Sequence, residues 1–175
     1  MSLQVREATE ADLPEIAAIY AHHVRTGLAS FETEPPDLAE MAARFHAVRE
    51  KGFPWLACET DGRLAGYAYA SHYRTRPGYR FCLEDSVYVH PAFAGRGAGR
   101  ALLARLVEAC EAVGCRQLVA VIGDSGNAAS IGLHSALGFQ LVGTLRAIGF
   151  KHGRWVDSVL MQRPIGPGDT SLPPE

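Results

Sequence analysis

The chain has 175 residues, of which 47% are hydrophobic and 21% are charged, and its formal net charge is -2. This composition predicts one globular domain with a sizeable core, and the weak net charge gives no electrostatic footprint for nucleic acid. The four cysteines lack the paired spacing of a zinc or redox site. The sequence opens without an apolar signal segment, and no uninterrupted apolar run approaches ~18 residues. We therefore expect a cytoplasmic protein with no metal, nucleic-acid or membrane partner.

The first half of the sequence contains both helical and strand patterns. The spacing of its apolar residues predicts six elements, which are a strand at 3–7, helices at 10–24 and 37–51, and strands at 53–60, 63–73 and 82–91. Thr9 and Asp37 stand at the helix starts, where their side-chain oxygens can accept free backbone N–H groups. Asp61-Gly62 is a strong hairpin signal, so the strands on either side of it should pair.

The second half adds two helices and three strands. A helix that Gly114 ends is followed by a strand at 117–123, a helix at 127–137 and strands at 139–150 and 155–162. Strands interleaved with helices in this order predict an α/β (α+β) fold with a mixed central sheet of about seven strands flanked by about four helices. We expect this domain to cover residues 1–165 and the Pro- and Gly-rich residues 166–175 to form a disordered tail.

A glycine-rich segment connects the strand that ends at Pro91 to the next helix. It reads HPAFAGRGAGRALL over residues 90–103 and places glycines at 95, 97 and 99. Free backbone N–H groups at a helix start bind phosphate, and glycine lets the phosphate approach closely. The segment lacks the Lys and hydroxyl of a Walker loop and the spacing of a Rossmann fingerprint. It is therefore either a phosphate site of another kind or a flexible turn.

The glycine segment resembles the pyrophosphate loop Q/R-x-x-G-x-G/A of the GNAT superfamily of acyl-CoA N-acyltransferases. The matching residues are 94–99, AGRGAG, in which the glycines agree and Ala94 replaces the leading Gln or Arg. The segments EDSVYVHP, IGDSGNAASIGLHSALGF and GTLRAIGFKHGRWVD are similar to those of the phosphinothricin and methionine sulfoximine N-acetyltransferases within that superfamily. The resemblance covers residues 3–163 and implies a GNAT-type fold, acetyl-CoA as the acetyl donor and a homodimer built partly by the final strands.

The resemblance also implies which residues hold the cofactor. Main-chain amides of the glycine loop would bind the pyrophosphate, and the strand before the loop would lie beside the pantetheine arm. The expected cofactor-binding residues are Val87, Tyr88, Val89, Gly95, Arg96, Gly97, Ala98, Gly99, Arg100 and Asn127. Asn127 is equally explained as the cap of the helix that it begins.

Two residues are candidates for the acid–base chemistry. An amine with a pKa of ~8 is mostly protonated at pH 7, so its attack on a thioester needs a general base. By the resemblance Glu84 is that base, with an ordinary surface residue as the alternative; the side chain of the neighbouring Asp85, a rival, should point to the opposite face of the sheet. His134 stands where many GNAT enzymes have a tyrosine for the leaving thiolate, and an imidazole can give a proton near neutral pH. The alternative is a His134 bonded only within its own helix.

The loop after the third strand is predicted to select the substrate. Arg74 and Arg76 can present two guanidinium groups to a carboxylate or an oxyanion, and Tyr79 can add a hydroxyl. In the related acetyltransferases this loop and the segment that matches SFETEP enclose a small amino acid with an oxygen-rich side-chain end, which makes Phe31 an apolar wall. Solvated arginines and a buried loop anchor are the alternatives. The expected substrate contacts are Phe31, Arg74, Arg76, Tyr79 and Glu84.

The sequence thus predicts an enzyme that transfers an acetyl group from acetyl-CoA to the α-amine of a small amino acid analogue by direct attack in a ternary complex. The analogue would be of the phosphinothricin, methionine sulfoximine or methionine sulfone type. The alternatives are a GNAT enzyme that acetylates a protein N-terminus or a polyamine, and a CoA-binding sensor without turnover. Arg74 and Arg76 argue against a cationic acceptor through like-charge repulsion, and Glu84 argues against a sensor.

Overall fold

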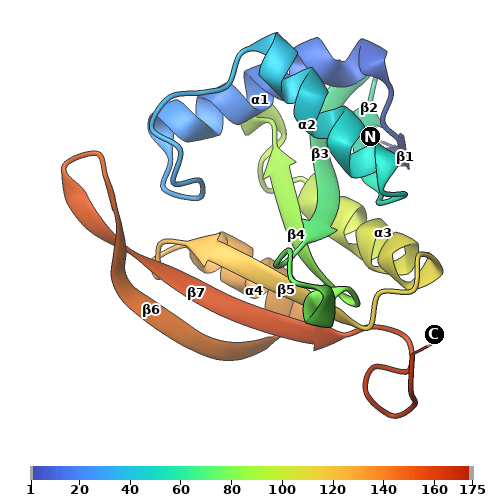
Figure 1. Ribbon diagram of the computed structural model, residues 1–175. Coiled ribbons are helices and arrows are strands. Elements are labelled where there is room, and N and C mark those ends of the chain that lie inside the picture. The colour runs from blue at the N-terminus through green and yellow to red at the C-terminus, as the bar shows by residue number, and fades with distance from the viewer. Residues whose placement is uncertain (1, 174–175) are drawn as a thin grey trace.

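The computed structural model describes residues 2–173 and contains a seven-stranded sheet with helices on both faces (Figure 1). The strands are β1 (Gln4–Glu7), β2 (Trp55–Thr60), β3 (Arg63–His72), β4 (Cys82–Val89), β5 (Gln117–Gly123), β6 (Gln140–Lys151) and β7 (Arg154–Pro164). The helices are α1 (Leu13–Thr26), α2 (Leu38–Glu50), α3 (Ala98–Ala112) and α4 (Ala128–Ala136), with short 3-10 turns at Glu10–Asp12, Pro77–Tyr79 and Pro91–Phe93. The predicted fold class and element order are confirmed. Within the described range, none of the helices has the length and apolarity needed to cross a membrane.

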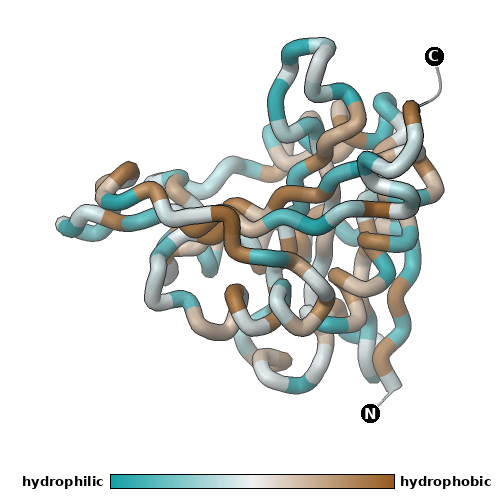
Figure 2. The backbone as a smooth tube through the Cα atoms, turned by 90° about the horizontal axis from the view of Figure 1, so that it is seen from below, coloured by the Kyte–Doolittle hydropathy of each residue, from teal (hydrophilic) through white to brown (hydrophobic). Residues whose placement is uncertain are grey.

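The strands lie side by side in the order β1-β2-β3-β4-β5-β7-β6. All neighbours are antiparallel except β4 and β5, because the chain returns between those two strands through α3, the kind of crossover that a parallel pair requires. β7 lies between β5 and β6, so the final hairpin forms the far edge of the sheet and projects from the body of the molecule (Figure 2). The two halves of the sheet therefore meet at β4 and β5.

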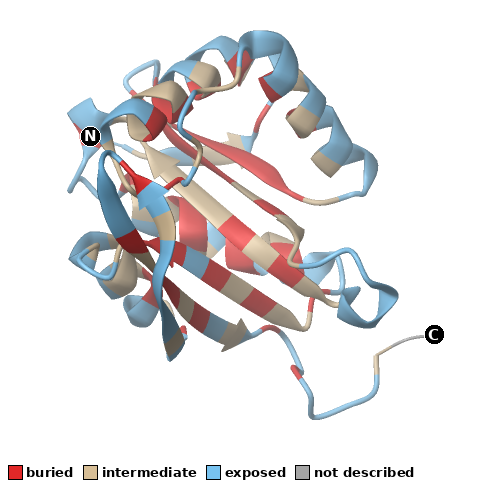
Figure 3. Cartoon of the chain, turned by 60° about the vertical axis from the view of Figure 1, so that its left-hand side comes forward, coloured by how far each residue is buried: buried red, intermediate tan, exposed pale blue. Residues whose placement is uncertain are grey.

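Each face of the sheet has its own hydrophobic core, and buried residues run along the central strands between the helices (Figure 3). On one face α3 contributes Leu102, Leu103 and Leu106, all fully buried. On the other face Ile16 of α1 packs with Trp55 and the aromatic residues of β3. The two cores use alternate residues of the same strands, because successive side chains of a strand point to opposite faces.

The residues predicted to begin helices and turns do so in the structure, with one adjustment. Asp37 Oδ1 accepts the backbone N–H three residues ahead at 2.8 Å and so caps α2. Thr9 donates its backbone N–H to Asp12 Oδ2 at 2.7 Å, and the first helix begins as a 3-10 turn before α1. Asp61 and Gly62 have φ values of 50° and 72°, which is the left-handed pair that a tight hairpin requires.

β4 and β5 pair over only part of their length. Residues 82–85 are in register with residues 117–120, but β4 continues to Val89 and β5 continues to Gly123. Beyond the last pair, each strand keeps hydrogen bonds only to its outer neighbour, β3 for β4 and β7 for β5. The two strands therefore diverge in the middle of the sheet, and this divergence positions the site described below.

The segment after β7 lies against Arg116, which precedes β5. The Arg116 guanidinium donates to the carbonyl oxygens of Gly168, at 3.0 Å, and of Leu172, at 3.2 Å. Residues 174–175 lie outside the described residues, and the division into a domain over 1–165 and a disordered tail over 166–175 stays a prediction.

Candidate active site

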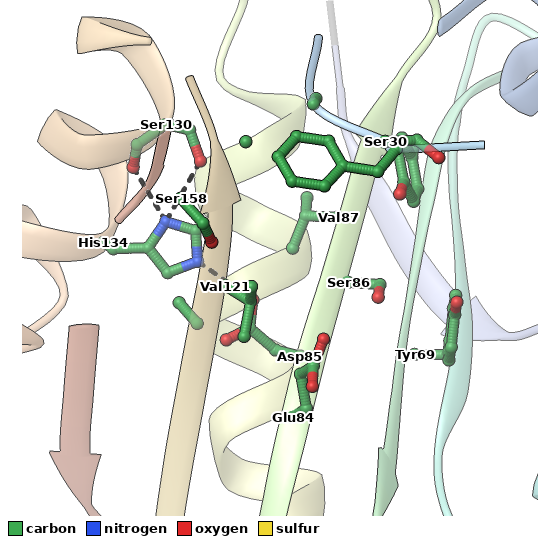
Figure 4. Close-up of a pocket in the computed structure, with 15 residues that line it drawn as sticks. Ser30, Tyr69, Glu84, Asp85, Ser86, Val87, Val121, Ser130, His134 and Ser158 are labelled. Carbon is green, nitrogen blue, oxygen red and sulfur yellow. Dashed lines mark hydrogen bonds and ion pairs between the residues drawn. The ribbon is translucent and has the colours of Figure 1, made fainter. Parts of the chain in front are cut away.

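A pocket of about 290 Å³ opens where β4 and β5 diverge (Figure 4). One wall is formed by residues 84–88 of β4, and the facing wall by β5 together with Ser158 of β7. Ser30 and Phe31, from the loop after α1, cover one side, while Ser130 and His134 of α4 border the other. Segments far apart in the sequence therefore converge on one cavity.

Glu84 reaches this pocket from β4, one residue before the last pair that β4 makes with β5. It stands in register with Ser71 of β3 and Val119 of β5, and its side chain is partly buried. Burial, with the negative charge of Asp85 as a smaller contribution, raises the pKa of Glu84 to about 7. Glu84 can therefore take up and release a proton near neutral pH, as a general base must.

His134 is buried on α4 and directs its ring toward β4 (Figure 4). Its Nε2 lies 2.9 Å from Asp85 Oδ2, and its Nδ1 lies 2.7 Å from the carbonyl oxygen of Ser130, one turn earlier in α4. Burial alone would lower the pKa of His134, but the hydrogen bond and charge of Asp85, with the Ser130 carbonyl, outweigh it and the net shift is upward. His134 thus bonds within its own helix through one nitrogen and faces the pocket wall through the other.

Asp85, which the sequence offers as a rival to Glu84, also borders this pocket and contacts His134. Strand alternation does send its side chain to the face opposite Glu84, as expected. Both residues nevertheless border one pocket, because the pocket lies in the gap between the strands and not on one face. Asp85 is 7% exposed, and its Oδ1 has no hydrogen-bond partner among the described residues.

The glycine loop brings the start of α3 to the edge of β4. Gly95 and Gly97 have φ values of 71° and 90°, a conformation that L side chains rarely adopt. Gly97 occupies the cap position of α3, and no side chain accepts the N–H groups of the first turn. A Cβ on Gly99 would lie 3.3 Å from Leu133 and 3.4 Å from Val89, so Gly99 allows close packing. The uncapped helix start fits an anion such as a phosphate.

The other predicted cofactor residues flank this helix start. Val87 and Tyr88 line the pocket, and the carbonyl oxygen of Val89 bonds to His23 Nε2 at 2.8 Å. Because β5 has turned away, the backbone groups of these three residues that face β5 have no strand partner.

The remaining predicted cofactor residues lie at two helix starts. Arg96 and Arg100 are exposed beside the start of α3, and Ala98 is buried there. Asn127 Oδ1 accepts the backbone N–H of Ser130 at 3.1 Å, which confirms Asn127 as the cap of α4. Its contact with a cofactor stays a prediction. Within residues 2–173, no group of three or more His, Cys, Asp or Glu side chains is placed to hold a metal ion.

The structure brings only part of the predicted substrate set together. Phe31 and Glu84 line the same pocket. Arg74, Arg76 and Tyr79 do not line it: the two arginines are exposed, and Tyr79 borders a neighbouring cavity of about 240 Å³. The loop conformation explains the difference, because the Arg74 guanidinium stacks on the adjacent ring of Tyr73 at 5.2 Å and not toward Glu84.

Several lining residues are not among the site residues that the sequence predicts. They are Ser30, Tyr69, Ser86, Val121 and Ser158. Ser30 illustrates why: its hydroxyl bonds to the Tyr20 hydroxyl at 2.8 Å, and its carbonyl oxygen accepts from Lys151 Nζ at 2.7 Å. A Cβ on Gly149 would lie 2.6 Å from the Phe31 ring, so a glycine inside β6 is needed for this loop to pack. These contacts join distant segments and leave no local pattern.

Taken together, these features define the class of the protein. A mixed sheet diverges at its one parallel pair, a glycine loop leads to an uncapped helix start beside the gap, and an ionisable carboxylate lies within it. This is the architecture of an acyl-CoA N-acyltransferase. The sequence pattern of the acetyltransferase (GNAT) family matches residues 16–139, and the chain belongs to that family.

Individual relatives narrow the comparison. The chain is 59% identical over 169 residues to a phosphinothricin N-acetyltransferase from Alcaligenes faecalis, covering 97% of this chain and 86% of the relative. It is 43% identical to an L-methionine sulfoximine/L-methionine sulfone acetyltransferase from Pseudomonas paraeruginosa, covering 95% and 97% of the two chains. A crystal structure of a GNAT superfamily phosphinothricin acetyltransferase from Sinorhizobium meliloti in complex with AcCoA superimposes with a TM-score of 0.97 at 47% identity, over 100% of this chain and 95% of that one.

The raised pKa of Glu84 predicts a pH-dependent effect of Glu84→Gln on stability. Because the folded-state pKa, about 7, lies above the ordinary value of 4.5, the folded state binds more protons between those pH values, and wild-type stability falls as pH rises through this window. Glutamine does not ionise, so the variant does not lose this stability. Between pH 5 and pH 8 its free energy of unfolding should therefore rise relative to that of the wild type, by about 2 kcal/mol after allowance for partial exposure. Denaturant unfolding at both pH values measures the gain, and equal differences at the two pH values would contradict the assigned environment.

Proposed function

We propose that this chain transfers the acetyl group of acetyl-CoA to the α-amine of a small amino acid analogue of the phosphinothricin, methionine sulfoximine or methionine sulfone type. The observation that carries the proposal is the pocket, in which Glu84 lies beside the buried pair of His134 and Asp85. The identity of 59% with a phosphinothricin N-acetyltransferase supports the acceptor class. The reaction would draw on acetyl-CoA of the cytoplasm, the location that the sequence predicts.

The described residues fit acetyl-CoA at two places. The start of α3 has no side-chain cap, so the amides of residues 97–100 suit the pyrophosphate, and Arg96 and Arg100 add positive charge beside them. The stretch 86–89 of β4 lacks a partner on the β5 side, so its backbone groups suit the amides of the pantetheine arm, near Asn127 at the start of α4. When bound, acetyl-CoA supplies the activated thioester.

Glu84 is the proposed general base. The α-amine of the acceptor, with a pKa of ~8 or above, arrives mostly protonated at pH 7 and must lose a proton before it can attack. With a pKa of about 7, Glu84 is ionised in a large fraction of molecules at neutral pH and can accept that proton directly or through water. The neutral amine then forms the C–N bond with the carbonyl carbon, and its nitrogen releases a second proton to water as the amide forms. The C–S bond breaks, and its electron pair leaves on sulfur.

His134 is the proposed proton donor to that sulfur. It borders the pocket, and its upward-shifted pKa keeps the ring protonated to a higher pH than an ordinary histidine. Transfer of its proton to the thiolate releases CoA as a thiol. The amine proton then resides on Glu84 and His134 is neutral, and proton exchange with water restores both groups.

The loop residues are proposed to select the acceptor. Phe31 closes one side of the pocket with an apolar ring. Tyr79 borders the neighbouring cavity, which Cys82 of β4 also lines. Cys82 stands two residues before Glu84 in the strand, so the two side chains lie on the same face of the sheet. Arg74 and Arg76 are exposed in the same loop and provide positive charge for an acceptor with an acidic or oxygen-rich side-chain end.

We also propose that the chain forms a homodimer through the hairpin of β6 and β7. Six of its large apolar side chains are 48% to 66% exposed: Leu141, Val142, Leu145, Ile148, Phe150 and Trp155. β6 is also an edge strand, so one side of its backbone has no strand partner within the described chain. An apolar surface of this kind typically marks an interface, and the resemblance noted in the sequence makes a second copy the expected partner.

A panel of acceptors tests the proposed activity. We expect thiol release from acetyl-CoA to be fastest with phosphinothricin, methionine sulfoximine or methionine sulfone, at least ~10-fold above a peptide with a free N-terminus or spermidine in kcat/KM, because a pocket with matching polar contacts discriminates strongly. A peptide or polyamine as the fastest acceptor would replace the proposed substrate class. Release with none of the amines would leave a CoA-binding sensor.

Analytical ultracentrifugation tests the dimer. The wild-type chain should sediment as a dimer at micromolar concentration, and Ile148→Asp should sediment as a monomer, because a charge buried at an apolar interface is costly. Val113→Asp provides the matched control, since Val113 is 44% exposed at the end of α3, away from the hairpin. A monomeric wild type, or a control that dissociates equally, would remove the hairpin as the interface.

A further inference from the structure

The pair formed by Asp85 and His134 is buried between elements that lie far apart in the chain. Asp85 is 7% exposed on β4, and His134 is 3% exposed on α4. Their side chains meet at 2.9 Å, between Oδ2 and Nε2, across a separation of 49 residues. Buried ion pairs contribute little stability compared with apolar packing of the same volume. The position of this pair at the pocket therefore calls for a chemical explanation.

The geometry of His134 fixes where its protons lie. Nδ1 faces the carbonyl oxygen of Ser130 at 2.7 Å, and because a carbonyl oxygen only accepts, Nδ1 carries a hydrogen. Nε2 faces Asp85, and an ionised carboxylate also only accepts, so Nε2 carries a hydrogen as well. An imidazole with both nitrogens donating is positively charged. The Ser130 hydroxyl, at 3.4 Å from Nδ1, is too distant to change this assignment.

Among residues 2–173, the second oxygen of Asp85 has no partner that would neutralise its charge. Oδ1 is buried without a hydrogen-bond partner among the described residues, and the residues in register with Asp85 on β3 and β5 are alanines. The titratable groups whose pKa its charge raises are His134 on α4, Glu84 on β4 and the Cys110 thiol on α3. A hydrogen bond with Cys115 and burial raise the pKa of Cys110, with a lesser contribution from Asp85, so this thiol stays neutral.

We propose that Asp85 is a positioning residue for acetyl transfer, which through its bond to Nε2 holds His134 in the doubly protonated form that gives a proton to the leaving thiolate. The inference rests on the proposed function, because that reaction produces the thiolate. When the C–S bond breaks and its electron pair moves to sulfur, sulfur takes the Nε2 proton. A neutral imidazole remains, with its Nδ1–H still bonded to Ser130, and a proton from water restores the charged form.

The same carboxylate acts on the base. Burial raises the pKa of Glu84, and the charge of Asp85 raises it further. Burial lowers the pKa of His134, but the hydrogen bond and charge of Asp85 raise it. Turnover needs Glu84 ionised and His134 protonated, so activity rises with pH through the first pKa and falls through the second. Asp85 therefore moves the whole active window to higher pH, where a larger fraction of the acceptor amine is neutral.

A pH–rate profile of Asp85→Asn tests the proposal. Asparagine keeps the shape but not the charge, so we expect the alkaline limb of kcat to shift down by ~1 pH unit or more and the acid limb to shift down by less. At pH 8 kcat should fall ~10-fold or more, while KM for acetyl-CoA changes little. Asp61→Asn removes the same charge from the exposed β2–β3 turn and should move neither limb. A lower kcat with both limbs in the wild-type position would make Asp85 merely structural and overturn the proposal.

Nitrogen NMR of the His134 ring provides a readout that needs no acceptor. In the wild type both ring nitrogens should be protonated at pH 7, with the signal identified by its loss in His134→Gln, and in Asp85→Asn one nitrogen should lose its proton. A neutral His134 in the wild type overturns the proposal even if Asp85→Asn does not fold. An acceptor panel without thiol release overturns the proposed function instead, so the two failures are distinguishable.

Discussion

The separation of β4 from β5 after residues 85 and 120 is the constraint on which the rest of the structure depends. If the two strands paired to their ends, residues 86–89 and 121–123 would be joined by hydrogen bonds and no pocket would open between them. Because they diverge, consecutive residues of β4 border one cavity although their side chains leave opposite faces of the sheet. Glu84 and Asp85 can therefore act in one site while each is supported by a different core.

The surrounding elements complete the gap in ways that follow from their packing. α3 connects the end of β4 to the start of β5, and its uncapped N-terminus lies at the end of β4 where the gap opens. Gly97 adopts the left-handed conformation that this helix start requires. α4 brings His134 to Asp85. The loop after α1 closes the other side and is held there by Lys151, whose ammonium bonds to the carbonyl oxygen of Ser30. Burial of the site and its acid–base properties thus have one cause, because the same packing that forms the cores desolvates Glu84.

Local patterns in the sequence predict the elements but not the site geometry. The caps, the Asp61-Gly62 turn and the glycine loop are set by neighbouring residues, so the sequence predicts them correctly. The stopping point of the β4–β5 register and the contact of Asp85 with His134 depend on residues tens of positions apart, and no periodicity marks them. The roles of Glu84 and of the pyrophosphate loop are predicted from the family resemblance and not from a local pattern. The exposure of Arg74 and Arg76 depends on the conformation of their loop, which the sequence does not predict.

The central claim is that a carboxylate with a pKa near neutrality, placed in the gap, takes the proton of the acceptor amine. The pH dependence of kcat/KM for Glu84→Gln tests it most directly, because glutamine keeps the shape and removes the basicity. The account predicts a loss of ~10²-fold or more at pH 7 that shrinks as pH rises, since the amine then loses its proton to solvent without help. A profile that runs parallel to the wild type at every pH would contradict it and leave Glu84 without a part in the proton transfer.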